Sequence, residues 1–311
     1  MLSKPASLHR RSFLVSTALI GSGLVLAGSM PALAARNTIR FFVLGDWGTK
    51  GGSGQRKVAA AMMETAKVTP PDFVISVGDN FYPDGVDSIS DDHWMKSFEQ
   101  IYNSPELQCP WYSVLGNHDR RGNIVAATRF HSVDSRWNMP SPFYNHTERL
   151  TETDIAEFFF LDTTPLQDTD WIAGSLDNQL KWFETQLKNS TAKWKIAVGH
   201  HPVYSSGYHG GIKAFADRVQ PLLESYGVHA YFCGHEHHLE HVKKYGIDYF
   251  VTGSGARTRP VESEEVWSNG SDFAASELGF AVGAIETDEM VVEYMSATAT
   301  SLFRTAVSPA R

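Results

Sequence analysis

Short apolar runs that end in a glycine and then a polar residue recur along the chain. Five segments share this design: IRFFVLGD (39–46), DFVISVGD (72–79), WYSVLGNHD (111–119), KIAVGHH (195–201) and AYFCGHEHH (230–238). Continuous apolar runs of this length are typical of strands that are buried on both faces. Amphipathic helical patterns alternate with them, at 55–68, 91–102, 175–189 and 212–226. The alternation predicts an α/β fold with largely parallel strands.

Three other regions have strand-like patterns with no helix between them. They lie at 143–162, 247–255 and 279–297, and we expect hairpins or a meander there, so that part of the sheet is antiparallel. The longest expected loops are 163–174 and 256–277, and loops of that length often border a functional site. Because no repeat or linker divides the chain, we expect a single domain over residues 35–311.

The first 34 residues have the features of an export signal. Paired arginines in HRRSFLV (9–15) precede an apolar stretch that runs to about Leu26, and ALAA (32–35) offers a cleavage site after Ala34. This pattern indicates the twin-arginine export machinery and a periplasmic or secreted bacterial protein. The alternatives are an ordinary secretory signal that contains Arg-Arg, or an uncleaved anchor, for which the apolar stretch is short.

Charge and cysteine content exclude several classes of function. Removing residues 1–34, which carry three basic residues and no acid, takes the formal net charge of the 311-residue chain from −8 to −11. So acidic a protein is a poor binder of nucleic-acid backbones, and no other stretch approaches membrane-spanning length. We expect no stable membrane association and a monomer. Cys109 and Cys233 are predicted to lie about 20 Å apart on parallel strands, too far for a disulfide, and therefore to be free thiols.

Metal-ligand side chains follow all five strand ends. Because ligands of open α/β sheets gather beyond the carboxyl ends of the strands, we expect these residues to converge. They are Asp46, Asp79, Asn117, His118, His200, His235 and His237. One such residue would be read as part of a turn, but five strand ends indicate a metal site. The set is too large for one tetrahedral zinc ion and suits two metals about 3.5–4 Å apart.

Tyr82 follows Asp79 by three residues, in the segment SVGDNFYPDG (76–85). A phenol with a pKa near 10 is a poor ligand for a divalent ion at neutral pH, whereas a trivalent cation can displace its proton. A tyrosine within reach of the first metal would therefore indicate ferric iron. The alternative is that Tyr82 packs beside Phe81 and Pro83 as an ordinary aromatic residue of a turn.

Taken together, the motifs identify a family resemblance. The blocks VLGDWG, VGDNFY, GNHD, VGHHPVYS, GYHG and CGHEHH resemble, in order, those of the small single-domain purple acid phosphatases, the tartrate-resistant branch of the calcineurin-like metallophosphoesterases. The resemblance covers roughly residues 39–305, and the tyrosine of GDNFY is its most specific element. It implies a four-layer α/β/β/α sandwich with mixed sheets.

The resemblance also implies a role for each site residue. Ferric iron would be held by Asp46, Tyr82 and His237, with Asp79 bridging to a second, divalent metal (Fe(II), Zn or Mn) held by Asn117, His200 and His235. His118 and His209 match two histidines near the phosphate. Three further histidines match no ligand role and are expected at the surface or behind the ligands: His201, His238 and His241.

The implied activity is hydrolysis of small phosphate monoesters by a metal-bound hydroxide, with an acid optimum. Two alternatives stay open, namely a divalent-metal phosphodiesterase or nucleotidase of the same superfamily and a non-catalytic secreted protein that binds phosphate or metal. Arg257 and Arg259 stand where relatives are less basic. They could contact a phosphate or a charged leaving group, or be exposed loop residues.

Overall fold

The computed structural model describes residues 37–167, 173–261 and 268–309. The predicted export signal, residues 1–34, lies outside these residues, as do parts of the two long loops. No helix within the described ranges has the length and apolar character needed to cross a bilayer.

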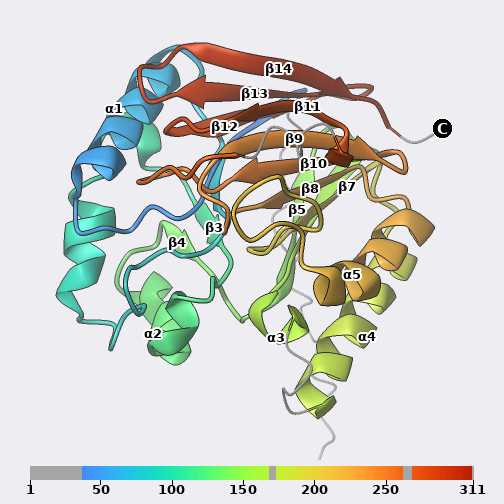
Figure 1. The fold of residues 1–311 in the computed structure, drawn as a ribbon, viewed down its shortest axis with the longest axis horizontal. Helices are drawn as coiled ribbons and strands as arrows, with labels where there is room; N and C mark the ends of the chain where they lie inside the picture. The colour runs from blue at the N-terminus through green and yellow to red at the C-terminus, as the bar shows by residue number, and fades with distance from the viewer. Residues whose placement is uncertain (1–36, 168–172, 262–267, 310–311) are drawn as a thin grey trace, which may run out of the picture. The chain divides into compact units, whose positions relative to one another are not determined.

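Two seven-stranded sheets organise the described residues (Figure 1). The strand order of the first is β14-β13-β12-β1-β2-β3-β4 and that of the second is β11-β9-β10-β8-β7-β6-β5. The first sheet contains β1 (Ile39–Leu44), β2 (Phe73–Ser76), β3 (Trp111–Ser113), β4 (Trp137–Asn138), β12 (Gly279–Ile285), β13 (Met290–Ser296) and β14 (Ser301–Val307). The second contains β5 (Tyr144–Arg149), β6 (Ile155–Phe160), β7 (Trp194–Val198), β8 (Ala230–Cys233), β9 (Leu239–Lys244), β10 (Ile247–Thr252) and β11 (Ser271–Ala275).

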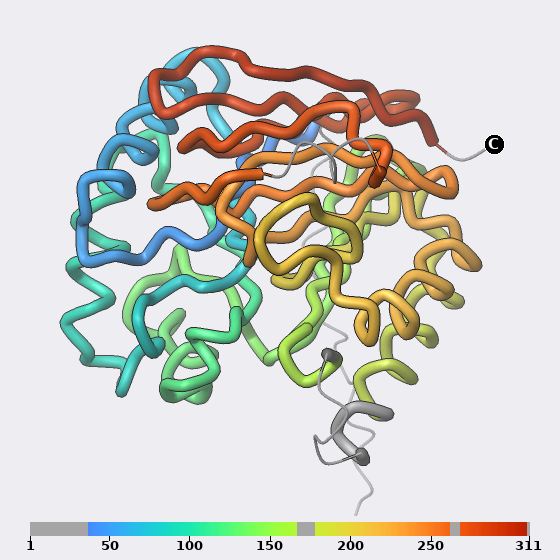
Figure 2. The backbone as a smooth tube through the Cα atoms, in the orientation of Figure 1, coloured from blue at the N-terminus to red at the C-terminus, as the bar shows by residue number. Residues whose placement is uncertain are grey.

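Both sheets are mixed, and the expectation of largely parallel strands is wrong. In the first sheet β1 to β4 run parallel, whereas β12, β13 and β14 are antiparallel neighbours that join β1. In the second, β6, β7, β8 and β10 are parallel, and β5, β9 and β11 are antiparallel. Strands joined by short connections pair antiparallel because a parallel pair needs a long crossover. The C-terminal strands, red in Figure 2, thus return to the N-terminal strand, blue.

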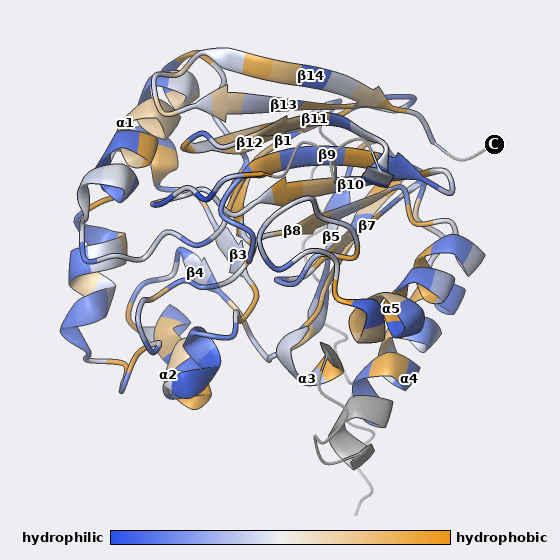
Figure 3. Cartoon of the chain, viewed as in Figure 1, coloured by the Kyte–Doolittle hydropathy of each residue, from blue (hydrophilic) through white to orange (hydrophobic). Residues whose placement is uncertain are grey.

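The sheets pack face to face around an aromatic core. Phe41 of β1 stacks on Phe73 of its own sheet and meets Phe158 and Phe232 of the other sheet edge-on, with ring centroids 5.7 and 5.8 Å away. All four side chains are buried. Figure 3 shows apolar residues along the central strands of both sheets. Aromatic pairs in this geometry stabilise the interface beyond the burial of their area.

Helices cover the outer face of each sheet. α1 (Ser53–Val68) lies against the first sheet and buries Val58 and Met62. On the other side, α4 (Ala173–Asn189) and α5 (Lys213–Ser225) pack on the second sheet through side chains such as Phe183 and Phe215 (Figure 1). The result is the predicted order of layers, helix, sheet, sheet, helix.

The helix predictions vary in accuracy. The patterns at 55–68, 175–189 and 212–226 correspond to α1, α4 and α5. The pattern at 91–102 forms only a π-helical turn, Trp94–Glu99. Two short helices, α2 (Ile124–Arg129) and α3 (Thr164–Gln167), and strands β4, β11 and β14 were not predicted. Short 3-10 turns occupy Pro105–Leu107, Asp119–Arg121 and Phe130–Ser132.

The two cysteines are free thiols, as predicted. Their separation has a different cause, however, because Cys109 precedes β3 in the first sheet and Cys233 ends β8 in the second. The strands that carry them therefore lie in different sheets.

Candidate metal centre

The metal-ligand residues meet where parallel strands of both sheets end. Asp46 follows β1, Asp79 follows β2 and Asn117 follows β3, all in the first sheet. His200 follows β7 and His235 follows β8, in the second sheet. We expected these residues at the edge of a single sheet. They lie instead at two neighbouring edges, one from each sheet.

Three of these residues have left-handed backbones. The φ angles are +60° at Asp46, +49° at Asp79 and +69° at His235. This conformation costs roughly 1–3 kcal/mol for a residue other than glycine and persists where the surrounding structure holds it. Gly116 shows how tightly the loops pack here, since a Cβ on it would lie 2.3 Å from the backbone nitrogen of Asp79. The glycine between strand and ligand residue therefore allows neighbouring backbones to approach closely, in addition to allowing the chain to turn.

The Tyr82 hydroxyl points into the first half of the centre. Its oxygen lies 2.9 Å from Asp46 Oδ1, 2.9 Å from Asp79 Oδ2 and 3.2 Å from His237 Nε2. His237 Nε2 is also 3.3 Å from Asp46 Oδ1. The side chain is buried, with 8% of its surface exposed. These contacts differ from those of an aromatic residue that only packs beside Phe81 and Pro83.

The second half is centred on the side-chain oxygen of Asn117. His200 Nε2 lies 3.2 Å from Asn117 Oδ1, and His235 Nδ1 lies 3.0 Å from the same atom. The other ring nitrogen of His200 is 2.9 Å from the Val77 carbonyl oxygen, to which it donates. A neutral His200 therefore turns the lone pair of Nε2 toward Asn117. Asp79 joins the two halves, because its Oδ1 lies 3.5 Å from His200 Nε2.

The cluster has too few protons to place a hydrogen bond between all of its neighbouring polar atoms, and this favours bound cations. Around Tyr82, four polar atoms approach one another, but only one hydroxyl proton and at most one imidazole proton can lie between them. Around Asn117, two imidazole nitrogens approach the same carbonyl oxygen. Acceptor atoms packed together in this way are stabilised when a cation binds to all of them. Carboxylate, phenolate, amide and imidazole donors suit hard and borderline metal ions, so the residues fit a pair of metals.

Electrostatics differ between the two halves. Burial, then the carboxylates of Asp46 and Asp79, raise the pKa of Tyr82 well above its usual value, so the phenol is neutral without a metal. Burial alone would raise the pKa of Asp46, but its hydrogen bond with His237 and the nearby imidazoles outweigh this and lower it. Burial, then the neighbouring His200, lower the pKa of His235 to about 2, which keeps this imidazole neutral in acid.

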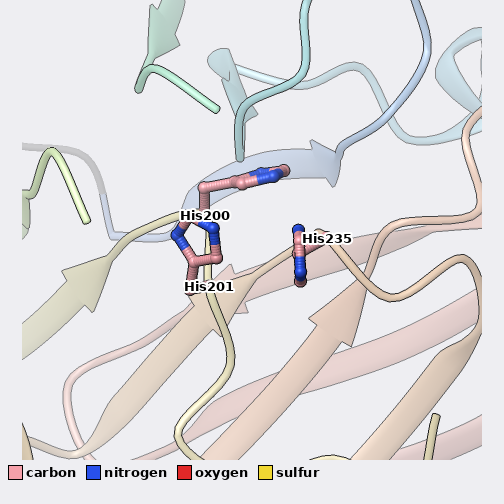
Figure 4. A group of neighbouring side chains, drawn as sticks. All are labelled: His200, His201 and His235. Carbon is pink, nitrogen blue, oxygen red and sulfur yellow. The ribbon is translucent and has the colours of Figure 1, made fainter. Parts of the chain in front are cut away.

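His201 lies directly beside the predicted ligands. Ligand atoms of His200, His201 and His235 lie within 4.8 Å of one another, as do those of Asp46, Asp79 and His200; Figure 4 shows the three imidazoles. His201 Nδ1 is 2.8 Å from the Thr163 hydroxyl, whose oxygen also accepts from the backbone N–H groups of His200 and His201. Its ring is fully buried. It therefore helps to fix the loop that carries His200.

His238 and His241 are also fully buried, so none of the three unassigned histidines lies at the surface. His238 Nε2 is 2.8 Å from Glu240, and His241 Nε2 is 2.9 Å from Asp248. Each imidazole is thus paired with a carboxylate of the second sheet, behind the ligands. His241 lies on β9, which pairs with β10 and β11 along its two edges, and its ring packs against Phe303 of the first sheet.

His118 and His209 line a cavity of about 600 Å³ over the centre. His118 Nδ1 contacts the Pro83 carbonyl oxygen, to which it donates, and its Nε2 lies 3.9 Å from Asp79 Oδ2. The His209 ring packs on that of His235, with centroids 4.6 Å apart. Its Nδ1 lies 3.0 Å from a carboxylate oxygen of Glu236. Each predicted phosphate-contacting histidine therefore has one nitrogen held by the protein.

Two carboxylates near the centre were not assigned a role from the sequence. Asp119, the last residue of GNHD, accepts from the backbone N–H groups of Asn80, Phe81 and Gly116 and so joins two ligand loops. Burial, then the charge of Asp79, raise its pKa to about 7. Glu236, between His235 and His237, is fully buried and accepts from the His209 backbone N–H at 2.6 Å. Their position inside the motifs was the only sequence signal.

Comparison with known sequences agrees with this geometry. The family model described as calcineurin-like phosphoesterase matches residues 39–239. Tartrate-resistant acid phosphatase type 5 of Oryctolagus cuniculus is 34% identical over 299 residues, which are 88% of this chain and 92% of that protein. Purple acid phosphatase 3 of Arabidopsis thaliana is 38% identical over 71% of this chain, and the match spans 64% of the plant protein's length.

Solved structures share the fold. GAP50, described as the anchor in the inner membrane complex of Plasmodium, superposes with a TM-score of 0.82 at 26% identity, over 89% of this chain and 90% of that one. The purple acid phosphatase PPD1 from yellow lupin seeds superposes with a TM-score of 0.66 at 18% identity, over 88% of this chain and 54% of that one.

Proposed function

The chain belongs to the calcineurin-like phosphoesterases, within the group of the purple and tartrate-resistant acid phosphatases, and from this premise we propose that it hydrolyses phosphate monoesters at a centre of ferric iron and a divalent metal. The observation that carries the proposal is the Tyr82 hydroxyl, which lies within 3.2 Å of Asp46, Asp79 and His237. A phenol in that position can become a ligand only if a strongly charged cation removes its proton.

Each half of the centre would hold one ion. In this proposal Asp46, Tyr82 and His237 hold the ferric ion and Asp79 is shared. Asn117, His200 and His235 hold the divalent ion, whether Fe(II), Zn or Mn. When bound, such a pair supplies positive charge for the phosphate oxygens and a water of lowered pKa as the nucleophile.

The cavity histidines would act on the phosphate and the leaving group. Because His118 Nδ1 donates to the Pro83 carbonyl oxygen, its Nε2 is the atom that faces Asp79 and the cavity. In acid, an imidazolium at that position can donate from Nε2 to the leaving oxygen. His209, held by Glu236 through its backbone and Nδ1, can contact a phosphate oxygen. Both roles depend on the charged imidazole, which is consistent with an acid optimum.

A simple assay tests the proposal. Purified protein loaded with iron and a divalent metal is expected to hydrolyse phenyl phosphate faster at pH 5 than at pH 8. A near-neutral optimum with no iron would favour the divalent phosphodiesterase or nucleotidase. No hydrolysis in a fully loaded sample would favour the non-catalytic alternative, which the likeness to a protein described as an anchor keeps in view.

We also propose that residues 1–34 direct export through the twin-arginine machinery and that residues 35–311 form one catalytic domain. The support is the sequence pattern around Arg10 and Arg11 and the cleavage site after Ala34. Because this route carries folded proteins, the metals could be inserted before export. Replacing both arginines by lysine should leave the enzyme in the cytoplasm, whereas unchanged export of that variant would contradict the proposal.

A further inference from the structure

A buried histidine, His93, lies behind the half of the centre that contains Tyr82. It directly precedes the π-helical turn Trp94–Glu99, and 3% of its surface is exposed. Its ring packs edge-on against that of Phe81, the residue before Tyr82, with centroids 5.1 Å apart. It does not line the cavity over the centre. π-helical turns are rare and often occur at functional sites, so the contacts of His93 were traced from this turn toward the centre.

Both ring nitrogens of His93 have a partner. Nε2 lies 2.7 Å from the Tyr82 carbonyl oxygen, and Nδ1 lies 2.7 Å from the Ser97 hydroxyl. Because a carbonyl oxygen can only accept, Nε2 carries a proton and donates to Tyr82. In the neutral imidazole Nδ1 then accepts from the Ser97 hydroxyl. The tautomer of His93 is thus fixed by the main chain of a predicted metal ligand.

The contact from His93 completes the anchoring of the Tyr82 main chain. The Tyr82 N–H donates to the carbonyl oxygen of Gly48 at 2.8 Å, so both backbone polar groups of Tyr82 are bonded. The hydroxyl at the far end of the same residue lies 2.9 Å from a carboxylate oxygen of Asp46 and 2.9 Å from one of Asp79. Holding the backbone of Tyr82 therefore also holds the phenol where a metal would bind.

The same turn holds the loop that follows Asp46. The Ser97 hydroxyl, which donates to His93, accepts from the Lys50 N–H at 2.8 Å. Ser97 is fully buried, so these hydrogen bonds are shielded from water. The pair His93–Ser97 thus links the loops of Asp46 and Tyr82, which are both predicted ligands of the same ion.

We propose that His93 is a positioning residue for Tyr82 and sets the affinity of this half of the centre for ferric iron. The inference rests on the proposed function, since it concerns the same centre. His93 holds the phenol beside the two carboxylates before an ion arrives, so that metal binding does not have to order the loop. Groups that orient a metal ligand typically change metal affinity 10- to 100-fold when they are removed. His200, in the other half, is oriented by the Val77 carbonyl oxygen instead, so the effect should be confined to iron.

Two amide variants separate this role from a general loss of packing. In His93→Gln the amide nitrogen can take the place of Nε2 and donate to Tyr82. In His93→Asn the shorter side chain reaches only the position of Nδ1, beside Ser97. The matched control is His229→Asn, since His229 is buried and lies at the opposite end of β8 from His235. Urea unfolding of the metal-free proteins shows which variants fold.

The first measurement is a titration of metal-free protein with ferric nitrilotriacetate, followed by visible absorption and elemental analysis, and a parallel titration with zinc. His93→Asn should bind iron about tenfold or more weakly and bind zinc as the wild type does. His93→Gln and His229→Asn should match the wild type for both ions. If His93→Asn does not fold, Ser97→Ala takes its place and should weaken iron binding in the same direction. Iron affinity equal to that of the wild type in the folded variant would overturn the inference.

Hydrogen exchange in the metal-free proteins separates this inference from the proposed function. The amide protons of residues 79–85 should exchange about tenfold faster in His93→Asn than in the wild type or His93→Gln, as expected for the loss of one buried hydrogen bond. If the wild type binds no ferric iron but this difference is seen, the proposed function fails and the positioning of Tyr82 by His93 stands. If the wild type binds iron but neither affinity nor exchange depends on His93, the inference is overturned and the proposed function stands.

Discussion

The two halves of the metal centre are built from different chemistry. The half around Tyr82 combines a phenol, the carboxylates of Asp46 and Asp79 and one imidazole. The half around Asn117 combines an amide oxygen and two imidazoles, with Asp79 as the carboxylate it shares with the first half. The first half offers up to three negative charges, whereas the second offers one that is shared.

This difference shows how one site can distinguish two metal ions. The first half carries a proton that only a strongly charged ion displaces, because burial and the two carboxylates raise the pKa of Tyr82. In the second half, burial and His200 keep the pKa of His235 at about 2, so this imidazole stays neutral in acid, whereas the carboxylates of Asp79 and Asp46 outweigh burial and raise the pKa of His200. In the proposed centre, charge and proton content, rather than cavity size, would direct the trivalent ion to one half and the divalent ion to the other.

The largest expected effect comes from the residue that both halves share. Asp79→Asn keeps the shape of the side chain but removes its charge, so both ions should bind more weakly. We expect kcat/KM for phenyl phosphate to fall about 1000-fold, which corresponds to about 4 kcal/mol, together with loss of both metals by elemental analysis. Asp288→Asn, at an exposed position, is the control. A variant with full metal content would show that Asp79 is not a shared ligand.

A smaller effect is expected outside the ligand set. His118→Ala should lower turnover of phenyl phosphate about 100-fold, in the range for loss of a general acid, and leave the content of both metals unchanged. The reason is that the His118 side chain lies 3.9 Å from Asp79 through Nε2, whereas the closer contact, from the His118 backbone N–H to Asp79 at 2.9 Å, is kept in the variant. His131→Ala, in an exposed turn, is the control. Parallel loss of turnover and metals would mean that His118 has a structural role.

The second half can be weakened separately. Asn117→Ala removes the oxygen that both His200 and His235 approach, so affinity for the divalent ion should fall roughly 10- to 100-fold, as for other changes around metal ligands. Iron content and the visible absorption should be retained. The measurement is a titration with the divalent metal, followed by activity and by elemental analysis. Loss of iron together with the divalent ion would show that the two halves are not independent.

The smallest effect concerns metal-free protein and its dependence on pH. Burial lowers the pKa of His201, and burial with His200 lowers that of His235, below their values in the unfolded chain. The unfolded state then binds more protons below about pH 6.5, so stability is lost as pH falls from 7 to 5, by up to about 1.4 kcal/mol per pH unit for each histidine. Urea unfolding in chelator should show this slope, and His235→Gln should reduce it, whereas His131→Gln should not. An unchanged slope in His235→Gln would contradict the buried neutral imidazole.

The sequence was most informative where local chemistry determines structure. A strand followed by glycine and a ligand requires a sharp turn at a sheet edge, so the positions of Asp46, Asp79, Asn117, His200 and His235 could be predicted. The direction of the Tyr82 hydroxyl could not, because spacing along a turn does not set which way a side chain points. The family resemblance supplied that expectation, and the structure shows the contacts.

Features that depend on distant segments were missed. The pairing of β12 with β1 joins parts of the chain more than 200 residues apart, and no local pattern indicates it. Asp119 and Glu236 act on loops from other strands, so their partners are visible only after folding. The burial of His201, His238 and His241 likewise depends on neighbours from both sheets. Except for His241, these residues lie within the sequence motifs described above, but their roles depend on the three-dimensional arrangement.

The most direct test of the two-half centre is the visible spectrum, with metal analysis, of the wild-type protein and the Tyr82→Phe variant purified side by side. We predict a coloured wild-type protein that contains at least about one iron per chain, because a phenolate bound to ferric iron absorbs visible light. The Tyr82→Phe variant should lack that band and still bind the divalent metal. A colourless wild-type protein without iron, or a variant that keeps the band, would contradict this prediction.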